Sequence, residues 1–201
     1  SLSSAMASWA VVAREPCAAV SHEAGDLENY DSLIECLRSG KTDATRQAAL
    51  ATFLAAAESR DGFPLVGDGR VVFVYLRSAE YDREDDRGSE EDFSPARRNE
   101  PIRVAGDFND WDGDDAALER EWGDFFHRSF RMVVSPTDRW RYKLIARDAA
   151  GGDVWFSDPL SRRFEFDSNG RISIVRGGQA SGHLEMVRAV WSARLGVERD
   201  L

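Results

Sequence analysis

The sequence predicts a mainly β protein, an antiparallel β-sandwich preceded by a small two-helix segment. Two observations support this fold class. Apolar residues recur at helical spacing before residue 67, whereas after it they alternate with the two-residue period of strands. The strand-like segments are short, and clusters of turn residues rather than helices separate them. Strands that follow one another in this way form antiparallel sheets, and packing two such sheets together buries their apolar faces.

Two helices are expected between residues 30 and 66. In the first, Ser32 followed by Glu35 has the spacing of a capping box, and Gly40 ends the helix. The second follows Asp43, and its apolar residues recur at helical spacing on one face: Leu50, Phe53, Leu54 and Ala57. We expect this segment to be a structural cap rather than a catalytic unit.

The strands are expected within residues 67–178. Val71–Leu76 is a continuous β-branched and aromatic run, typical of a buried sandwich strand. Glu80–Glu100 is highly charged and poor in apolar residues, which predicts a long, mobile connection. Asp110–Trp122 is expected to be a second acidic connection, and Ser168–Gly170 a hairpin turn. Further strands are expected at Ile102–Ala105, Phe125–Val134, Trp140–Arg147, Val154–Phe156 and Ile172–Val175.

The expected strand Trp140–Arg147 alternates most strictly. One face would carry Trp140, Tyr142, Leu144 and Ala146, and the other would carry Arg141, Lys143, Ile145 and Arg147.

The charge balance argues against two classes of partner. The formal net charge is −10, which disfavours binding to nucleic acid or to an anionic membrane surface. No apolar run approaches the ~20 residues that a helix needs to span a bilayer, so no membrane span is expected.

The two cysteines, Cys17 and Cys36, both lie in the N-terminal region. A disulfide between them would anchor the weakly apolar segment around Cys17 to the first helix, and it would place the protein in a secreted or periplasmic compartment. Two free thiols in a cytosolic protein are the alternative. Residues 1–13 are uncharged and lack the basic start of a signal peptide, so they do not enter the fold prediction.

Residues for catalysis are not arranged in any recognisable pattern. The chain has no Gly-x-Ser-x-Gly pentapeptide, which an acyl-transferring nucleophile elbow would require. The histidines His22, His127 and His183 fall in unrelated segments, and His127 is expected to be a surface or cross-strand residue. We therefore expect no catalytic residues and no cofactor in this chain.

The acidic stretch after residue 107 matches a calcium-binding loop only in part. Asp110, Asp112, Asp114 and Glu119 would fall in the register of an EF-hand, but its first position would then be Phe108, which cannot bind a metal. A solvated loop is the expected state, with no metal site.

Four motifs in order resemble the glycogen-binding-type modules of the early-set sandwich domains. They are Gly106-Asp-Phe-Asn-Asp-Trp111, Tyr142-Lys143-Leu144, Trp155, and Asp158-Pro159, and the resemblance covers about residues 70–176. It implies an immunoglobulin-like, early-set antiparallel β-sandwich. It also implies a sugar-binding surface formed by Trp111, Lys143 and Trp155, with Asn169 as a counterpart whose register is shifted. The alternative for Trp111 is burial in the core; exposure of both tryptophans on one face with Lys143 would favour sugar binding.

The last residues, His183–Leu201, resemble the linker and first strand that precede the α/β-hydrolase domain of esterases related to enterochelin esterase. This resemblance implies a non-catalytic accessory domain of a secreted esterase, whose partner is its own C-terminal hydrolase domain and which helps to position substrate. An α-glucan-binding module is the alternative function, and a hydrolase active in its own right is a third. The expected parts of the chain are a tail at 1–29, the helices at 30–66, the sandwich at 67–178 and a linker at 179–201.

Overall fold

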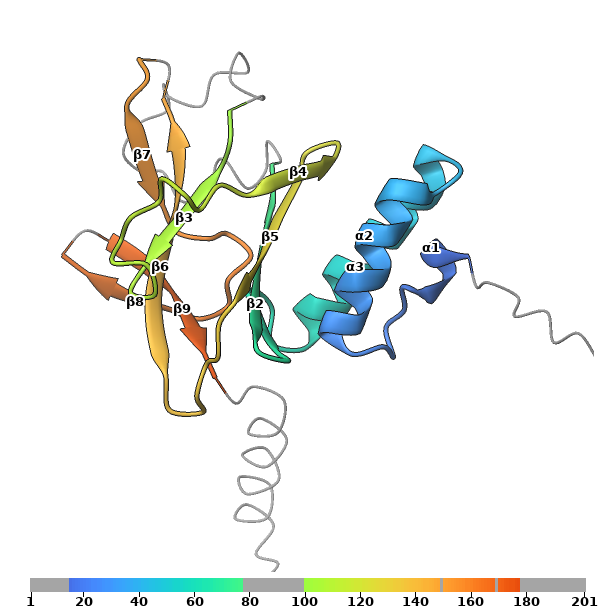
Figure 1. Cartoon of the computed structure of the whole chain (residues 1–201), viewed down its shortest axis with the longest axis horizontal. Helices are drawn as coiled ribbons and strands as arrows, with labels where there is room; N and C mark the ends of the chain where they lie inside the picture. The colour runs from blue at the N-terminus through green and yellow to red at the C-terminus, as the bar shows by residue number, and fades with distance from the viewer. Residues whose placement is uncertain (1–14, 78–99, 149, 169, 178–201) are drawn as a thin grey trace, which may run out of the picture.

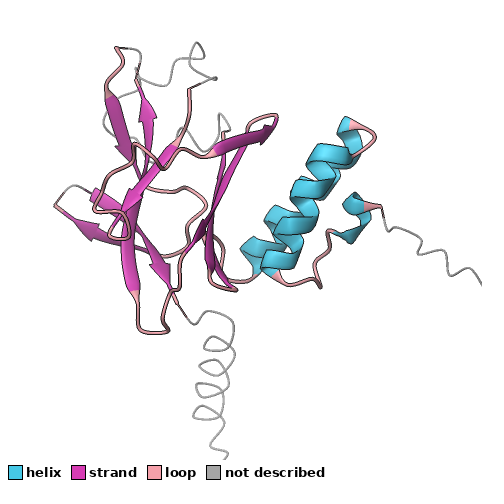
Figure 2. Ribbon diagram, in the orientation of Figure 1, coloured by secondary structure: helices cyan, strands magenta, loops and turns pink. Residues whose placement is uncertain are grey.

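The computed structural model describes residues 15–77, 100–148, 150–168 and 170–177. Within these ranges the chain forms three layers, with α-helices packed on one antiparallel sheet and a second antiparallel sheet on its other side (Figures 1 and 2). The predicted mainly β, two-sheet architecture with preceding helices is therefore confirmed.

The helical layer consists of α1 (Pro16–Ala19), α2 (Asp26–Ser39) and α3 (Asp43–Ser59). Cys17 in α1 and Cys36 in α2 form a disulfide, as predicted. This bond ties the short α1 to a helix that is itself packed on the first sheet.

The start of α2 differs from the prediction. The helix begins at Asp26, and Ser32 and Glu35 lie in its middle rather than forming a cap. Gly25 accepts the first helical hydrogen bond from the Asn29 backbone, and the acids Asp26 and Glu28 lie where the helix dipole favours negative charge. The predicted stop at Gly40 is confirmed, since its N–H donates to the carbonyl of Cys36.

The first sheet has the strand order β1-β2-β5-β4. Its strands are β1 (Leu65–Gly67), β2 (Arg70–Leu76), β5 (Phe125–Arg131) and β4 (Glu119–Trp122). Strand β2 is buried on both faces: Val72 and Val74 pack against the helices, whereas Val71, Phe73 and Tyr75 pack against the second sheet. This double burial explains the continuous apolar run in its sequence.

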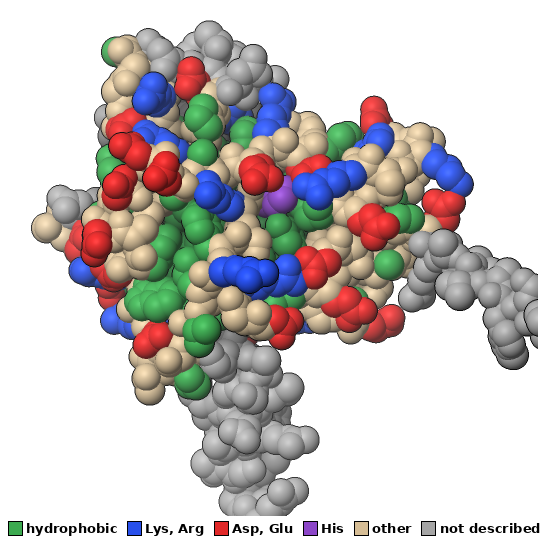
Figure 3. Space-filling model, in the orientation of Figure 1, with side chains coloured by type: hydrophobic (Ala, Val, Ile, Leu, Met, Phe, Trp, Pro, Cys, Tyr) green, Lys and Arg blue, Asp and Glu red, His purple; other side chains and the backbone are tan. Residues whose placement is uncertain are grey.

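The second sheet has the order β3-β6-β9-β8, with β7 also paired to β6. Its strands are β3 (Arg103–Gly106), β6 (Arg139–Arg147), β7 (Asp153–Phe156), β8 (Phe164–Asp167) and β9 (Gly170–Arg176). The apolar face predicted for β6 lies in the core between the sheets, and β8 and β9 form the hairpin predicted around residues 168–170. Figure 3 shows one side of the molecule, where hydrophobic side chains gather over the sheets and charged ones surround them.

Two details depart from the predicted pattern. Glu119–Trp122 is a strand, β4, although it was expected to be part of a connection. Ile145, on the polar face predicted for β6, is fully buried because the loop after β3 folds over it. A Cβ atom at Gly113 in that loop would lie 2.7 Å from Ile145 Cδ1, so any larger residue would force the Ile145 side chain to move.

Several predictions lie outside the described residues: most of the connection at 80–100, the segments 1–14 and 179–201, and Asn169. Among the helices that the structure describes, none is both long and apolar enough to cross a bilayer.

Candidate functional site

The outer face of the second sheet carries two of the predicted binding residues. Trp155 on β7 lies directly opposite Ile145 on β6. Lys143 is two residues from Ile145 on the same strand, so it shares this face and is a diagonal neighbour of Trp155. Trp155 is 43% exposed, and Lys143 is half-buried.

Trp111 reaches the same place from the loop after β3. Its ring lies beside that of Trp155, with 6.4 Å between the ring centroids and 40° between the ring planes. Trp111 is half-buried and does not belong to the core between the sheets. We call Trp111 and Trp155 the tryptophan platform.

The position of Trp111 is fixed by Asp107. The indole N–H of Trp111 donates to Asp107 Oδ1 at 3.0 Å. The same carboxylate accepts the backbone N–H of Arg141 at 2.8 Å and forms an ion pair with the Arg141 side chain at 3.1 Å. Partial burial opposes ionisation of Asp107, but these hydrogen bonds outweigh it and lower the pKa of the carboxyl. The platform is therefore anchored to the first residues of β6.

The turn that presents Trp111 is held by Asn109. Its side-chain oxygen accepts the Gly106 N–H at 2.8 Å, and its amide donates to the carbonyl of Val104 at 3.2 Å. Asp110 and Trp111 both have positive φ, 53° and 61°, which is unfavourable for residues with a side chain. The turn thus holds Trp111 in a strained backbone conformation.

The other residues of the motif serve the fold. A Cβ atom at Gly106 would lie 2.3 Å from the Arg141 carbonyl oxygen, so β3 and β6 can approach only with glycine there. The Phe108 ring packs against Phe73 and Trp140 in the core between the sheets. Phe108, rather than Trp111, therefore fills the core position.

Arg103 joins the two segments that carry the platform, a role that its sequence context does not reveal. This side chain on β3 is almost buried, and it forms ion pairs with Asp114 at 3.2 Å and with Asp153. Asp114 lies in the loop after Trp111, and Asp153 begins the strand of Trp155. The only signal in the sequence was an arginine between two apolar strand residues, which does not reveal its partners.

The remaining candidates can be placed only in part. Asp114, a candidate calcium ligand, forms an ion pair with Arg103. Among the described residues no group of three or more His, Cys, Asp or Glu side chains could hold a metal ion. Asn169 is not among the described residues, so its relation to the platform stays a prediction.

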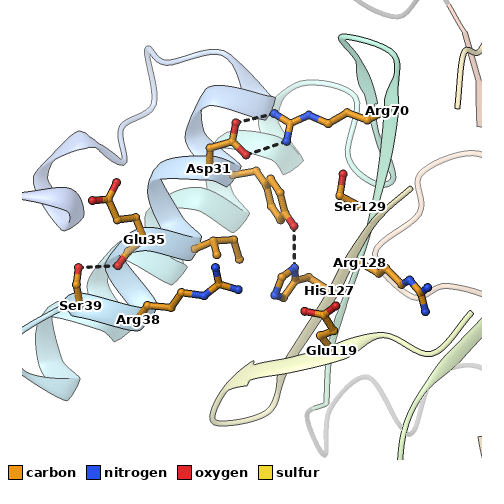
Figure 4. A pocket seen from close by; sticks show the side chains of 11 residues that line it. Asp31, Glu35, Arg38, Ser39, Arg70, Glu119, His127, Arg128 and Ser129 are labelled. Carbon is orange, nitrogen blue, oxygen red and sulfur yellow. Dashed lines mark hydrogen bonds and ion pairs between the residues drawn. The ribbon is translucent and has the colours of Figure 1, made fainter. Parts of the chain in front are cut away.

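A separate groove of about 680 Å³ lies between α2 and the first sheet (Figure 4). At its centre the Tyr30 hydroxyl lies 2.7 Å from His127 Nδ1, and His127 Nε2 lies 3.2 Å from Glu121. Two ion pairs flank this contact, Arg38 with Glu121 and Arg70 with Asp31, each through two hydrogen bonds of 2.6–2.8 Å.

Burial determines the protonation of this network. It raises the pKa of Tyr30 to about 12 and lowers the pKa of the His127 imidazole. A neutral imidazole then accepts the Tyr30 O–H at Nδ1 and donates from Nε2 to Glu121, whose pKa the Arg38 hydrogen bond lowers. Both ring nitrogens are occupied and the phenol stays protonated, so the network holds α2 against β5 rather than supplying a base or nucleophile. His127 is buried on β5 directly opposite Val74 and Glu119, so of the two expected alternatives it is the cross-strand residue and not the surface one.

A further polar contact lies at the core between the two sheets. The Tyr142 hydroxyl donates to Asp158 at 2.7 Å, and both side chains are fully buried. Burial raises the pKa of Asp158 to about 6, although the Tyr142 hydrogen bond opposes this shift. Asp158 fixes the chain where it leaves β7, which accounts for the Asp-Pro motif as a structural element.

Comparison of the chain with protein-family models and with curated proteins gave no match.

Proposed function

We propose that this chain is a non-catalytic carbohydrate-binding module whose outer sheet face holds a glycan on the tryptophan platform. The observation that carries the proposal is the pairing of Trp111 and Trp155, 6.4 Å apart on one accessible face, with Lys143 on the same face. The apolar faces of sugar rings pack on exposed aromatic rings, while a few polar groups select the hydroxyls.

The geometry of the platform favours a curved glycan. The two rings are inclined by 40°, so two consecutive sugar units stacked on them would turn relative to each other. A helical α-linked chain has such a turn, whereas a flat β-linked ribbon does not. This supports an α-glucan, the ligand that the resemblance to glycogen-binding-type modules implies.

The contacts that hold the two tryptophans in place favour recognition of the ligand by a rigid surface. Asp107 and Arg141 fix Trp111, and Arg103 connects its loop to the strand of Trp155. A surface arranged before the ligand arrives loses less conformational entropy on binding. Lys143 would donate to sugar hydroxyls, and Asn169 would do the same if its side chain reaches this face.

The proposal includes a secreted or periplasmic location and an immunoglobulin-like fold class. The Cys17–Cys36 disulfide supports a secreted or periplasmic location, where such bonds persist. The two antiparallel sheets support an immunoglobulin-like, early-set sandwich.

The role of accessory domain to an esterase is a second candidate. One observation favours it: Val133, 77% exposed, lies near the β5–β6 turn, and the Gly177 backbone, where the described chain ends, lies beside Ser135 in the same turn. A catalytic domain that follows residue 201 would have this apolar turn within reach.

Titration with maltoheptaose, followed by tryptophan fluorescence, tests the sugar-binding proposal. We expect saturable quenching, and we expect Trp155→Ala to weaken binding about tenfold or more because one stacking surface is lost. Phe166→Ala, which removes another exposed aromatic ring away from the platform, is the matched control and should leave the affinity unchanged. Absence of quenching at millimolar ligand would refute the proposal.

A further inference from the structure

We propose that β8 is a dimerisation strand. Two copies of the chain would pair β8 with β8 in antiparallel orientation, with the two-fold axis at Glu165. The second sheets of the two copies would then form one continuous sheet.

The first observation is the exposure of two aromatic residues on an edge strand. Within the described residues β8 pairs only with β9, and it lies at the end of the second sheet (Figure 1). Phe164 and Phe166 are 45% and 74% exposed, and their rings are 5.7 Å apart. The Arg171 guanidinium lies over the Phe164 ring at 4.1 Å. An exposed aromatic edge strand is a template for pairing with another strand.

The second observation is the direction of the backbone groups. The Ile174 N–H donates to the Arg163 carbonyl, so these two residues occupy a hydrogen-bonded position of the ladder, while the Arg163 N–H donates to Ser161 Oγ. Because such pairs alternate along an antiparallel ladder, Glu165 also bonds to β9, and the N–H and C=O groups of Phe164 and Phe166 point to the open edge. The two phenylalanines therefore present the backbone groups that a partner strand needs.

These directions restrict how two β8 strands can pair. With the axis at Glu165, Phe164 of one copy forms a hydrogen-bonded pair with Phe166 of the other, which gives four backbone hydrogen bonds in total. Each phenylalanine side chain then lies beside one from the partner, and Arg163, which also pairs with Asp61 of its own chain at 2.7 Å, lies opposite Asp167 of the other copy. Moving the axis to Phe166 would set Glu165 against Asp167, a repulsion between like charges. Moving it to Phe164 would set Phe166 against Arg162.

The charge at the axis does not oppose this arrangement. Glu165 of one copy lies opposite Glu165 of the other. Each carboxylate, however, already forms an ion pair with Arg139 on β6 of its own chain. The self-complementary edge, with apolar residues on one face and opposite charges on the other, favours a second copy of this chain as the occupant.

Sedimentation velocity of the whole chain over a range of concentrations tests the dimer. We expect a reversible monomer–dimer equilibrium, and we expect Phe166→Ser to raise the dissociation constant about tenfold or more, because an exposed ring that becomes buried in the dimer is removed. Val133→Ser changes an equally exposed hydrophobic residue elsewhere and should have no effect. A chain that stays monomeric at every concentration overturns the proposal, as does a dimer that Phe166→Ser does not weaken.

A cross-link tests the register. Cys17 and Cys36 are the two cysteines of the chain and are bonded to each other, so an introduced cysteine is the only free thiol. Residues opposite each other in a pair without backbone hydrogen bonds have Cα atoms about 4.5 Å apart, within the range for a disulfide. We expect Glu165→Cys to form a covalent dimer under mild oxidation, whereas Val133→Cys should not. A dimer in which Glu165→Cys fails to cross-link would contradict the axis at Glu165.

One consequence rests on the proposed glycan binding. Because a two-fold axis through paired edge strands keeps both sheets facing the same way, the two tryptophan platforms would lie on one face. A polymeric glucan would then bind more tightly than a short one, by avidity. The sedimentation and cross-linking measurements need no glycan, so failure of sugar binding would leave the dimer standing.

Discussion

At the scale of single residues, the six positions Gly106–Trp111 separate fold from function. Gly106 permits close strand packing and Phe108 fills the core, whereas Asp107 and Asn109 hold the turn that presents the sixth residue, Trp111. The sequence pattern revealed the strand and the turn because each depends on local chemistry. It could not reveal Arg103, whose partners lie 11 and 50 residues away. The sequence likewise could not reveal which way the Trp111 side chain points, because this is seen only from its contact with Trp155.

The buried Asp158 should give the stability a dependence on pH at this scale. Its pKa is about 6 in the folded chain and about 3.9 when unfolded, so its stabilising contribution is complete below pH 4 and is lost as pH rises through 6. The loss should be on the order of 3 kcal/mol. We expect the difference in unfolding free energy between wild type and Asp158→Asn to change over this interval, as measured by urea denaturation. A constant difference from pH 4 to 7 would contradict the assignment.

His127 should act in the opposite direction. Burial lowers its pKa in the folded chain, so the stability it supports is present above the unfolded pKa of about 6.5 and falls as pH decreases below that value. Protonation of Nδ1 also removes the acceptor of the Tyr30 hydrogen bond. We expect His127→Gln to reduce this loss of stability on acidification. An NMR titration that placed the His127 pKa at or above 6.5 would disagree with this account.

At the scale of elements, some helices and strands can be predicted from the sequence and others cannot. Strands β2 and β6 were predictable because their apolar period is strong, whereas β4 has the sequence Glu-Arg-Glu-Trp and lies at the edge of its sheet, where burial imposes no pattern. The start of α2 was not predictable from Ser32 because a capping signal inside a helix has no effect once earlier residues have begun it. Helix α1 is too short to form without an anchor, and the disulfide provides one.

Removal of this disulfide should weaken the helical layer. The bond closes a loop with a sequence separation of 19, so Cys17→Ser with Cys36→Ser should lower the unfolding free energy by about 3 kcal/mol. Chemical denaturation would measure this loss, and hydrogen exchange should show that α1 becomes unprotected while β6 keeps its protection. If α1 exchanged as slowly as before, its anchor would have to lie elsewhere.

At the scale of the whole molecule, the three layers divide the tasks between two faces of the sandwich. The helices pack on the outer face of the first sheet, and the tryptophan platform lies on the outer face of the second. The platform and the β8 edge both belong to that second sheet. The fold class could be predicted from the periodicity of apolar residues. Which sheet face the helices cover and which carries the platform could not be predicted, because this depends on which strands pair in each sheet.

The central claim is that Trp111 and Trp155 together bind a glycan, and the indole N–H signals of the six tryptophans test it most directly by NMR. On addition of maltoheptaose we expect the signals of Trp111 and Trp155 to shift together along one saturation curve, while those of Trp122 and Trp140, on β4 and β6, stay in place. Each signal would be assigned by a single tryptophan-to-phenylalanine substitution. No shift of these two signals at millimolar ligand, or shifts confined to the other four, would contradict the account.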